Sequence, residues 1–177
     1  MRLENTSHTL APKPHLRPLP KLCGGTLPSP EQKRPFWERK TLREMNKDEW
    51  EALCDGCGKC CLHKLEDKDT GEVKYTSVAC RLLDLKTITC TNYKNRARLV
   101  ADCLQLSPDN IPTFHWLPGT CAYRRLAEGK KLEPWHPLIS GNRNSVHEAG
   151  ISIKGKCVSE REAGDLHDYL WPDNQDI

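Results

Sequence analysis

The 177-residue chain lacks the long apolar runs that cross or enter membranes. No uncharged stretch approaches the ~18 residues of a membrane span, and the first twenty residues contain no apolar core typical of a signal peptide. We therefore expect a soluble, cytoplasmic protein. Reducing conditions there keep thiols free, so a cysteine-rich pattern indicates a metal or redox site more often than disulfides. The even count of ten cysteines does not by itself exclude disulfides.

Apolar and aromatic residues are also scarce. Hydrophobic residues make up 37% of the chain and aromatic residues 6%, so little apolar area is available to offset the entropy lost on folding. The length fits one domain, because domains usually span roughly 100–200 residues. Something other than core packing should therefore hold the fold, and the ten cysteines are the candidate.

The net charge of +3 is concentrated at the N-terminus. Residues 1–34 carry a net +4, which leaves −1 on residues 35–177, and seven of the thirteen prolines fall in the first 35 residues. Proline removes a backbone donor and disfavours helix at the preceding residue. We predict a disordered, proline-rich tail over residues 1–34 and one domain over residues 35–177. The near-neutral domain argues against nucleic acid as a partner.

Turn and capping signals predict a small irregular α+β fold of short helices and a β-hairpin. A helix is expected after Pro35, and Asn46 with Glu49 has the spacing of a capping box for a second. The segments LHKLED and EVKYTSV flank KDTG, which predicts the hairpin. Another short helix, CAYRRLAE, should end at Gly129.

Weaker signals complete the expected secondary structure. Ser107-Pro108 indicates a further helix start, and the stretch 130–145 is expected to be a loop. GISIKGKCV predicts one strand, after which Ser159 and Glu162 have capping-box spacing for a last short helix.

Closely spaced cysteines are the strongest signal in the chain. A two-residue gap lets a tight turn bring two sulfurs to one metal ion, and Gly56 and Gly58 permit the backbone angles that such a turn needs. Adjacent residues usually direct their side chains apart, so Cys60 and Cys61 are hard to place on one tetrahedral ion. We infer two neighbouring four-coordinate sites, with a bridged binuclear site as the alternative. CDGCGKCC contains four of the cysteines, and four more follow: Cys54, Cys57, Cys60 and Cys61, then Cys80, Cys90, Cys103 and Cys121.

The identity of the metal stays open at this stage. Four thiolates suit structural Zn²⁺, whereas C-x-x-C-x-x-C plus one distant cysteine also suits a [4Fe–4S] cluster. We therefore expect zinc or iron as the cofactor. CGKC also resembles a dithiol redox motif, but no βαβ pattern surrounds it.

These residues resemble a known family. CDGCGKCCLHKL, Cys80-x-x-Leu83 and Cys90-x-x-Tyr93 with Cys103 are similar to the cysteine-cluster domain of YkgJ-type proteins, a zinc- or iron-chelating domain. PFWERKTL, PTFHWLPGTCAYRRLAEGK and WHPL resemble the YcgN-type proteins of proteobacteria, from Pro35 almost to the end. The resemblance implies cytoplasmic bacterial proteins of unestablished activity. It also implies eight metal ligands: Cys54, Cys57, Cys60, Cys61, Cys80, Cys90, Cys103 and Cys121.

Other residues give no basis for a reaction. The chain contains no convincing glycine-rich phosphate loop, nucleophile elbow or paired-carboxylate motif, so no catalytic residue is assigned. His63 is expected to be an ordinary half-exposed histidine, and His136 to fix a loop through a backbone hydrogen bond. Cys23 and Cys157 lie outside the family pattern. Three functions remain: a metal-binding protein, which we favour, an iron–sulfur redox protein, and a zinc-stabilised protein or nucleic-acid adaptor.

Overall fold

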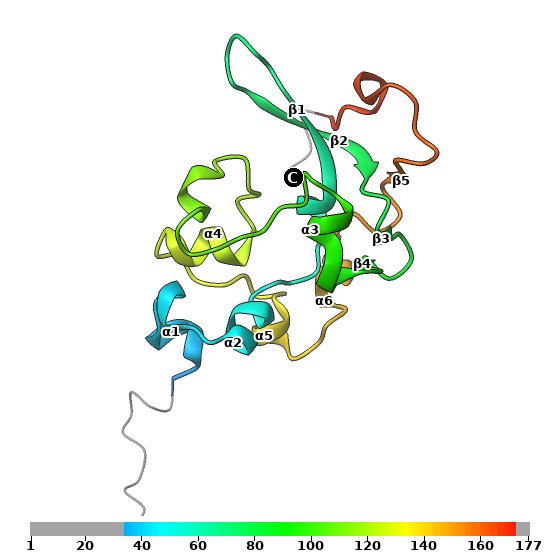
Figure 1. Ribbon diagram of the computed structural model, residues 1–177. Coiled ribbons are helices and arrows are strands. Elements are labelled where there is room, and N and C mark those ends of the chain that lie inside the picture. Colours follow the sequence, from blue (N-terminus) through cyan, green and yellow to red (C-terminus); the bar gives the residue numbers. More distant parts are fainter. Residues whose placement is uncertain (1–33, 173–177) are drawn as a thin grey trace, which may run out of the picture. The chain divides into compact units, whose positions relative to one another are not determined.

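The computed structural model describes residues 34–172, so the predicted tail lies, apart from Arg34, outside the described residues. Along this part of the chain, two short α-helices are followed by four consecutive strands, then by four further α-helices and a last strand (Figure 1). The helices are α1 (Phe36–Arg39), α2 (Lys47–Ala52), α3 (Arg96–Leu99), α4 (Ala122–Ala127), α5 (Pro137–Ser140) and α6 (Ser145–Glu148). The 3₁₀ turns are η1 (Leu42–Glu44), η2 (Lys59–Cys61), η3 (Tyr93–Asn95), η4 (Ile111–Thr113) and η5 (Leu166–Tyr169). No helix in residues 34–172 is long and apolar enough to cross a membrane.

The predicted hairpin is confirmed as β1 (Leu62–Glu66) and β2 (Val73–Ala79), which pair antiparallel and project from the rest of the fold (Figure 1). In its turn, the Asp67 side chain accepts the backbone N–H groups of Asp69 and Thr70. β5 (Val158–Ser159) adds parallel to the end of β2, and β3 (Leu83–Asp84) pairs antiparallel with β4 (Thr89–Cys90).

Two helices follow their local sequence signals. Asn46 accepts the Glu49 backbone N–H at 2.9 Å, and the Glu49 side chain accepts the Asn46 N–H at 2.9 Å, so the predicted capping box begins α2. The helix predicted from CAYRRLAE is α4, and Gly129 follows it with a φ of +69°. That positive φ is one that glycine adopts without strain.

Other segments differ from the prediction. The helix expected after Pro35 is interrupted, because Lys40 and Thr41 are extended between α1 and η1. Ser107-Pro108 enters a turn rather than a helix, and the expected loop 130–145 contains α5. Residues 151–157 form no strand, and only β5 follows them. The expected last helix is replaced by turns and η5, since the Glu162 N–H donates to the Ser159 carbonyl instead of forming a capping box.

Two hydrophobic clusters replace a single large core. The first is built from buried residues of α2's end, η4 and α4: Leu53, Ile111, Leu117, Ala122, Tyr123 and Leu132. The second lies under the hairpin and β3: Leu62, Tyr75, Ala79, Leu83, Ile88 and Ile153. Trp116 packs against both. Because Leu53 and Leu62 belong to different clusters, the cysteine-rich segment between them connects the two.

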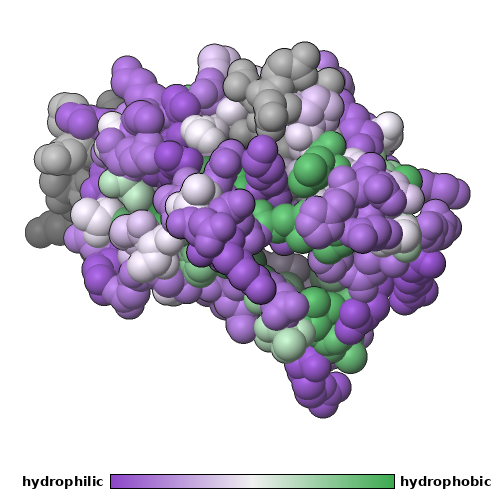
Figure 2. Space-filling view, turned by 90° about the horizontal axis from the view of Figure 1, so that it is seen from above, coloured by the Kyte–Doolittle hydropathy of each residue, from purple (hydrophilic) through white to green (hydrophobic). Residues whose placement is uncertain are grey.

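The fold class of short mixed helices and strands is therefore confirmed, while its organisation by metal stays a prediction. The visible face in Figure 2 is largely hydrophilic, with hydrophobic side chains confined to small patches. This surface agrees with the mean hydropathy of −0.70. Two small clusters of short elements leave much of the tertiary constraint to other interactions.

Candidate metal centre

The cysteine loop, residues 54–61, turns tightly between the two hydrophobic clusters. Gly56 and Gly58 have φ of +79° and +77°, in the left-handed region that favours glycine, as the sequence predicts. The Asp55 side chain accepts the Cys57 N–H at 2.9 Å and shapes the first half of the loop. From outside the loop, the Cys57 carbonyl accepts the Ile153 N–H at 3.0 Å. The loop is therefore fixed both by its own turn chemistry and by a distant segment.

Four thiols, which we call the first thiol group, line one cavity: Cys54, Cys57, Cys60 and Cys121. The cavity measures about 40 Å³ and is otherwise walled mainly by side chains of the first hydrophobic cluster, including Leu53, Leu117 and Tyr123. Cys121 immediately precedes α4 and is far along the chain from the cysteine loop. The fold thus gathers three cysteines of one loop and one distant cysteine, which is the ligand pattern of a closed thiolate site.

The environment of these thiols favours their protonated form in the absence of a cation. Burial, together with the Asp55 charge, raises the pKa of Cys57 well above its ordinary value. A hydrogen bond with Cys61 and burial raise the pKa of Cys60, and burial raises the pKa of Cys121 to about 11. Since only thiolates bind metal well, a cation entering the cavity would displace these protons.

The other four predicted ligands are called the second thiol group: Cys61, Cys80, Cys90 and Cys103. The Cys80 N–H donates to the Cys61 carbonyl at 2.9 Å, and the Leu83 N–H to the Cys80 carbonyl at 2.9 Å. Leu83 in turn pairs with Cys90 across β3 and β4. Burial raises the pKa of Cys103, Arg96 opposes this shift, and the nearby thiols of Cys80, Cys90 and Cys60 add to the rise. Backbone pairing thus links Cys61, Cys80 and Cys90, and charge coupling links Cys103 to Cys80 and Cys90.

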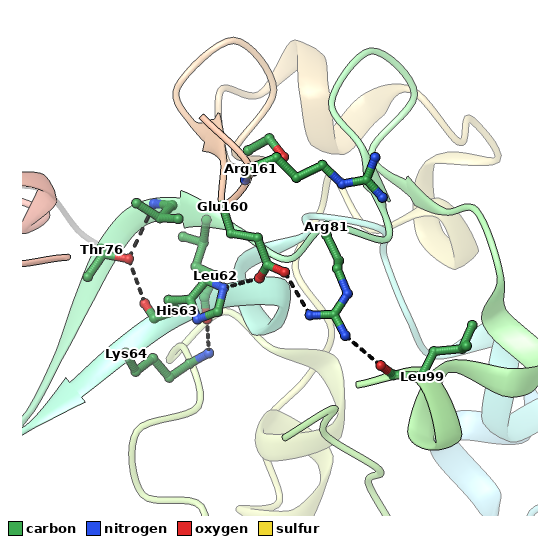
Figure 3. A network of polar contacts seen from close by, with 10 residues as sticks. Leu62, His63, Lys64, Thr76, Arg81, Leu99, Glu160 and Arg161 are labelled. Carbon is green, nitrogen blue, oxygen red and sulfur yellow. Dashed lines mark hydrogen bonds and ion pairs between the residues drawn. The ribbon is translucent and has the colours of Figure 1, made fainter. Parts of the chain in front are cut away.

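An ionic network ties together the segments that carry the second thiol group (Figure 3). Glu160, just after β5, accepts His63 Nε2 of β1 at 2.5 Å and Arg81 Nη1 at 3.0 Å. Arg81, adjacent to Cys80, also donates to the Leu99 carbonyl at the end of α3 at 2.6 Å. The Glu160 carboxylate therefore joins His63, which follows Cys61, to Arg81. Arg81 in turn holds the end of α3, which precedes Cys103.

Lys64 places a positive charge beside both thiol groups. Its Nζ donates to the carbonyls of Cys60 at 3.1 Å and Leu62 at 2.6 Å, and it lies 4.5 Å from the ring centre of Trp116. Burial lowers the pKa of Lys64, while the charges of Cys60 and Cys61 oppose that shift. The ammonium is positioned to offset negative charge on thiolates.

The thiols of the first group line a common cavity, but their sulfur atoms are not yet in the arrangement that would coordinate one metal ion. Within residues 34–172, no three Cys, His, Asp or Glu side chains stand as the ligands of one ion. The donor chemistry nevertheless fits zinc or iron, because both metals are held by four cysteine sulfurs in proteins. Binding would require the thiols to move inward, and the ligand set stays a prediction.

Neither candidate histidine is arranged as a ligand. His63 is bound to Glu160, and its side chain is partly exposed, in agreement with the expectation. His136 is only 1% exposed; its Nε2 donates to the Leu53 carbonyl at 3.0 Å, and its Nδ1 accepts the Leu138 N–H at 3.1 Å. Backbone groups therefore occupy both ring nitrogens of His136, which fixes the residue preceding Cys54. The loop-fixing role predicted for His136 is confirmed.

Residues outside the predicted set also shape the site. Asp55, which was not predicted as a site residue, is buried in the cavity wall. The one feature of the sequence that could have indicated its role is its position between two cysteines in CDGC. Cys157 lies outside both thiol groups: its Sγ donates to the Ile153 carbonyl at 3.4 Å and it packs on the second hydrophobic cluster. Cys23 lies outside the described residues.

Comparison with known proteins gives consistent matches. The CxxCxxCC family, described as a "putative zinc- or iron-chelating domain", matches residues 53–122. A UPF0260 protein of Rhizorhabdus wittichii is 58% identical over 137 residues, which cover 77% of this chain and 94% of the relative. The UPF0260 protein of Gluconacetobacter diazotrophicus is 56% identical over 140 residues, covering 78% and 88%.

The UPF0260 protein YcgN of Escherichia coli is 54% identical over 136 residues, covering 77% of this chain and 89% of the relative. No solved structure was found to match. The resemblance drawn from the cysteine motif and its flanking segments is thereby confirmed. With identities above one half over most of the relatives' length, the chain belongs to the UPF0260 family.

Proposed function

We propose that this chain is a cytoplasmic metal-binding protein in which zinc or iron, held by cysteine thiolates, organises a small fold. The observation that carries the proposal is the convergence of Cys54, Cys57, Cys60 and Cys121 on one cavity. Thiols that are far apart in sequence have little reason to line a shared pocket in a cytoplasmic protein unless they bind a common ligand. No reaction is assigned to the thiols.

Two ions, one for each thiol group, fit the arrangement better than one. Cys60 and Cys61 are consecutive, yet Cys60 lines the cavity of the first group while the Cys61 carbonyl pairs with Cys80 of the second. Two divalent ions with eight thiolates would leave a local charge of −4, which Lys64 between the groups partly offsets. The eight cysteines of the two thiol groups are therefore the proposed ligands.

Metal analysis of protein purified without oxygen tests the proposal. We expect two metal ions per chain, and visible absorption then separates the metals, because Fe–S clusters absorb visible light and Zn²⁺, a d¹⁰ ion, does not. A coloured protein that bleaches on reduction would instead favour the iron–sulfur redox function. Soluble, folded protein that contains no metal and takes up neither zinc nor iron would refute the metal-binding function.

Serine substitutions should remove the two ions separately. Cys57→Ser is expected to lose the ion of the first thiol group and keep the other, because serine is a poor substitute for a thiolate. Cys90→Ser should lose the second ion and keep the first. Metal content per chain, measured by mass spectrometry of the native protein, gives the count.

Cys157→Ser is the matched control, since this thiol makes a backbone contact outside both groups, and it should retain both ions. If Cys57→Ser and Cys90→Ser each lose both ions, the thiols bridge one binuclear site. Equal loss in Cys157→Ser would show that the ligand set is wrong.

The N-terminal tail should be dispensable for metal binding. A chain beginning at Pro35 loses a net charge of +4, so weak, salt-sensitive affinity for nucleic acid should disappear with it, while metal content stays unchanged. Two basic residues of the remaining domain are already engaged, since Arg124 pairs with Glu128 and Arg125 with Glu133. Filter binding of RNA and DNA at low and moderate salt measures the effect. Sequence-selective, salt-resistant binding by the shortened chain would favour the adaptor function instead.

A further inference from the structure

Asp55 occupies an unusual position for a carboxylate. It lies inside the cysteine loop between two proposed ligands, is 8% exposed and lines the cavity of the first thiol group. One carboxylate oxygen, Oδ1, accepts the Cys57 N–H at 2.9 Å. The other oxygen, Oδ2, is buried and has no hydrogen-bond partner within residues 34–172.

An unpartnered, buried carboxylate oxygen is costly. Buried polar atoms are almost always hydrogen-bonded, and buried charges are paired with other charges or coordinate metals. The other side-chain atoms in the described residues that share this condition, Thr120 Oγ1 and Trp171 Nε1, belong to neutral groups. Among the described residues, Asp55 Oδ2 therefore lacks a hydrogen-bond donor in the cavity that four thiols line.

We infer that Asp55 belongs to the metal site and that its Oδ2 would supply an oxygen donor, in addition to the four sulfurs of the first thiol group, to the ion held there. The inference rests on the proposed metal-binding function and adds a specificity-determining residue to it. Zinc accepts carboxylate oxygen together with sulfur and nitrogen, whereas copper(I) favours soft sulfur ligands. A carboxylate at this position thus favours a divalent ion over copper(I).

The rival explanation is that Asp55 only shapes the turn through Oδ1. Asp55→Asn separates the two explanations, because asparagine keeps the Oδ1 acceptor for the Cys57 N–H and replaces Oδ2 with an uncharged donor. Asp67→Asn is the matched control: Asp67 forms the same kind of turn in the exposed hairpin loop, where Oδ1 accepts the Asp69 N–H at 3.0 Å.

The experiment measures Zn²⁺ affinity by competition with a chromophoric chelator, and the absorption spectrum after loading with Co²⁺. We expect Asp55→Asn to bind the first ion about 10- to 100-fold more weakly, the range seen for groups supporting a metal site. Its Co²⁺ ligand-field bands should also shift. Asp67→Asn should match the wild type in both measurements. Should Asp55→Asn fail to accumulate, Asp55→Ser, whose hydroxyl can still accept the Cys57 N–H, replaces it.

The possible outcomes are distinct. Wild-type affinity and an unchanged Co²⁺ spectrum in the asparagine or serine variant would overturn the role of Asp55 while leaving the thiolate sites intact. Wild-type protein that takes up neither Zn²⁺ nor Co²⁺ would overturn the metal function itself. Weakened binding in Asp67→Asn as well would trace the effect to general destabilisation and also overturn the inference.

Discussion

Removal of bound metal by a strong chelator, under reducing conditions without oxygen, is expected to abolish most of the tertiary structure. Helices of four to six residues are not stable alone, and the two hydrophobic clusters are small. Thiolate ligation can contribute on the order of 10 kcal/mol in small zinc domains, which is comparable to the whole stability of a domain. Thermal melting followed by circular dichroism, before and after chelation, measures the loss.

Reversibility is the control for this prediction. Zinc or iron added back to the chelated protein should restore the original melting curve, which separates loss of metal from damage to the thiols. An unchanged melt in protein verified to be metal-free would contradict the dependence of the fold on metal. The two hydrophobic clusters would then be sufficient for stability, and the thiols would not contribute to it.

Gly58→Ala should strongly destabilise the protein although it leaves every thiol in place. A Cβ at this position would lie 2.6 Å from Ile88 Cγ2 and 2.9 Å from Ile153 Cγ1, with φ at +77°. The left-handed backbone costs a non-glycine residue about 1–2 kcal/mol, and overpacking adds about 1–3 kcal/mol. We therefore expect the free energy of unfolding to fall by about 2–5 kcal/mol, measured by urea denaturation of the metal-loaded protein.

Gly56→Ala is the matched control, because its φ of +79° is close to that of Gly58, but within residues 34–172 no atom beyond its chain neighbours lies within 4 Å of the added Cβ. It should cost only the backbone contribution, about 1–2 kcal/mol. Combining Gly58→Ala with Ile88→Ala should cost less than the sum of the two single changes, since the double change removes the nearest clash. Equal losses for Gly56→Ala and Gly58→Ala would show that backbone conformation alone decides the outcome.

Local signals in the sequence predicted the elements that depend on local chemistry. The Asn46–Glu49 capping box, the hairpin around KDTG and the glycine after α4 all form as expected, because each involves residues a few positions apart. The strand predicted from GISIKGKCV did not form, apart from Val158 in β5, and the reason is a non-local contact. Its alternation suits a strand, but Ile153 donates to the distant Cys57 carbonyl and packs in the second hydrophobic cluster. No local rule contains that partner.

The candidate site likewise has one part that local sequence predicts and one part that depends on distant contacts. The spacing of Cys54, Cys57 and Cys60 places them together through one glycine-containing loop, and this follows from sequence alone. The convergence of Cys121 on them depends on how α4 packs. The family resemblance implied Cys121 as a ligand, but it did not indicate which thiols Cys121 joins. Asp55 was missed because burial and an absent hydrogen-bond partner are properties of the folded chain.

The contact between Ile153 and Cys57 also bears on how the protein is made. Chains emerge from the ribosome N-terminal end first, and domains fold as their residues become available. The cysteine loop is therefore synthesised long before Ile153 covers Gly58 and before β5 joins β2. Throughout that interval the contact with Ile153 does not yet cover the loop. On the proposed function, metal delivered during translation would reach the cysteine loop before the downstream segment closes over it.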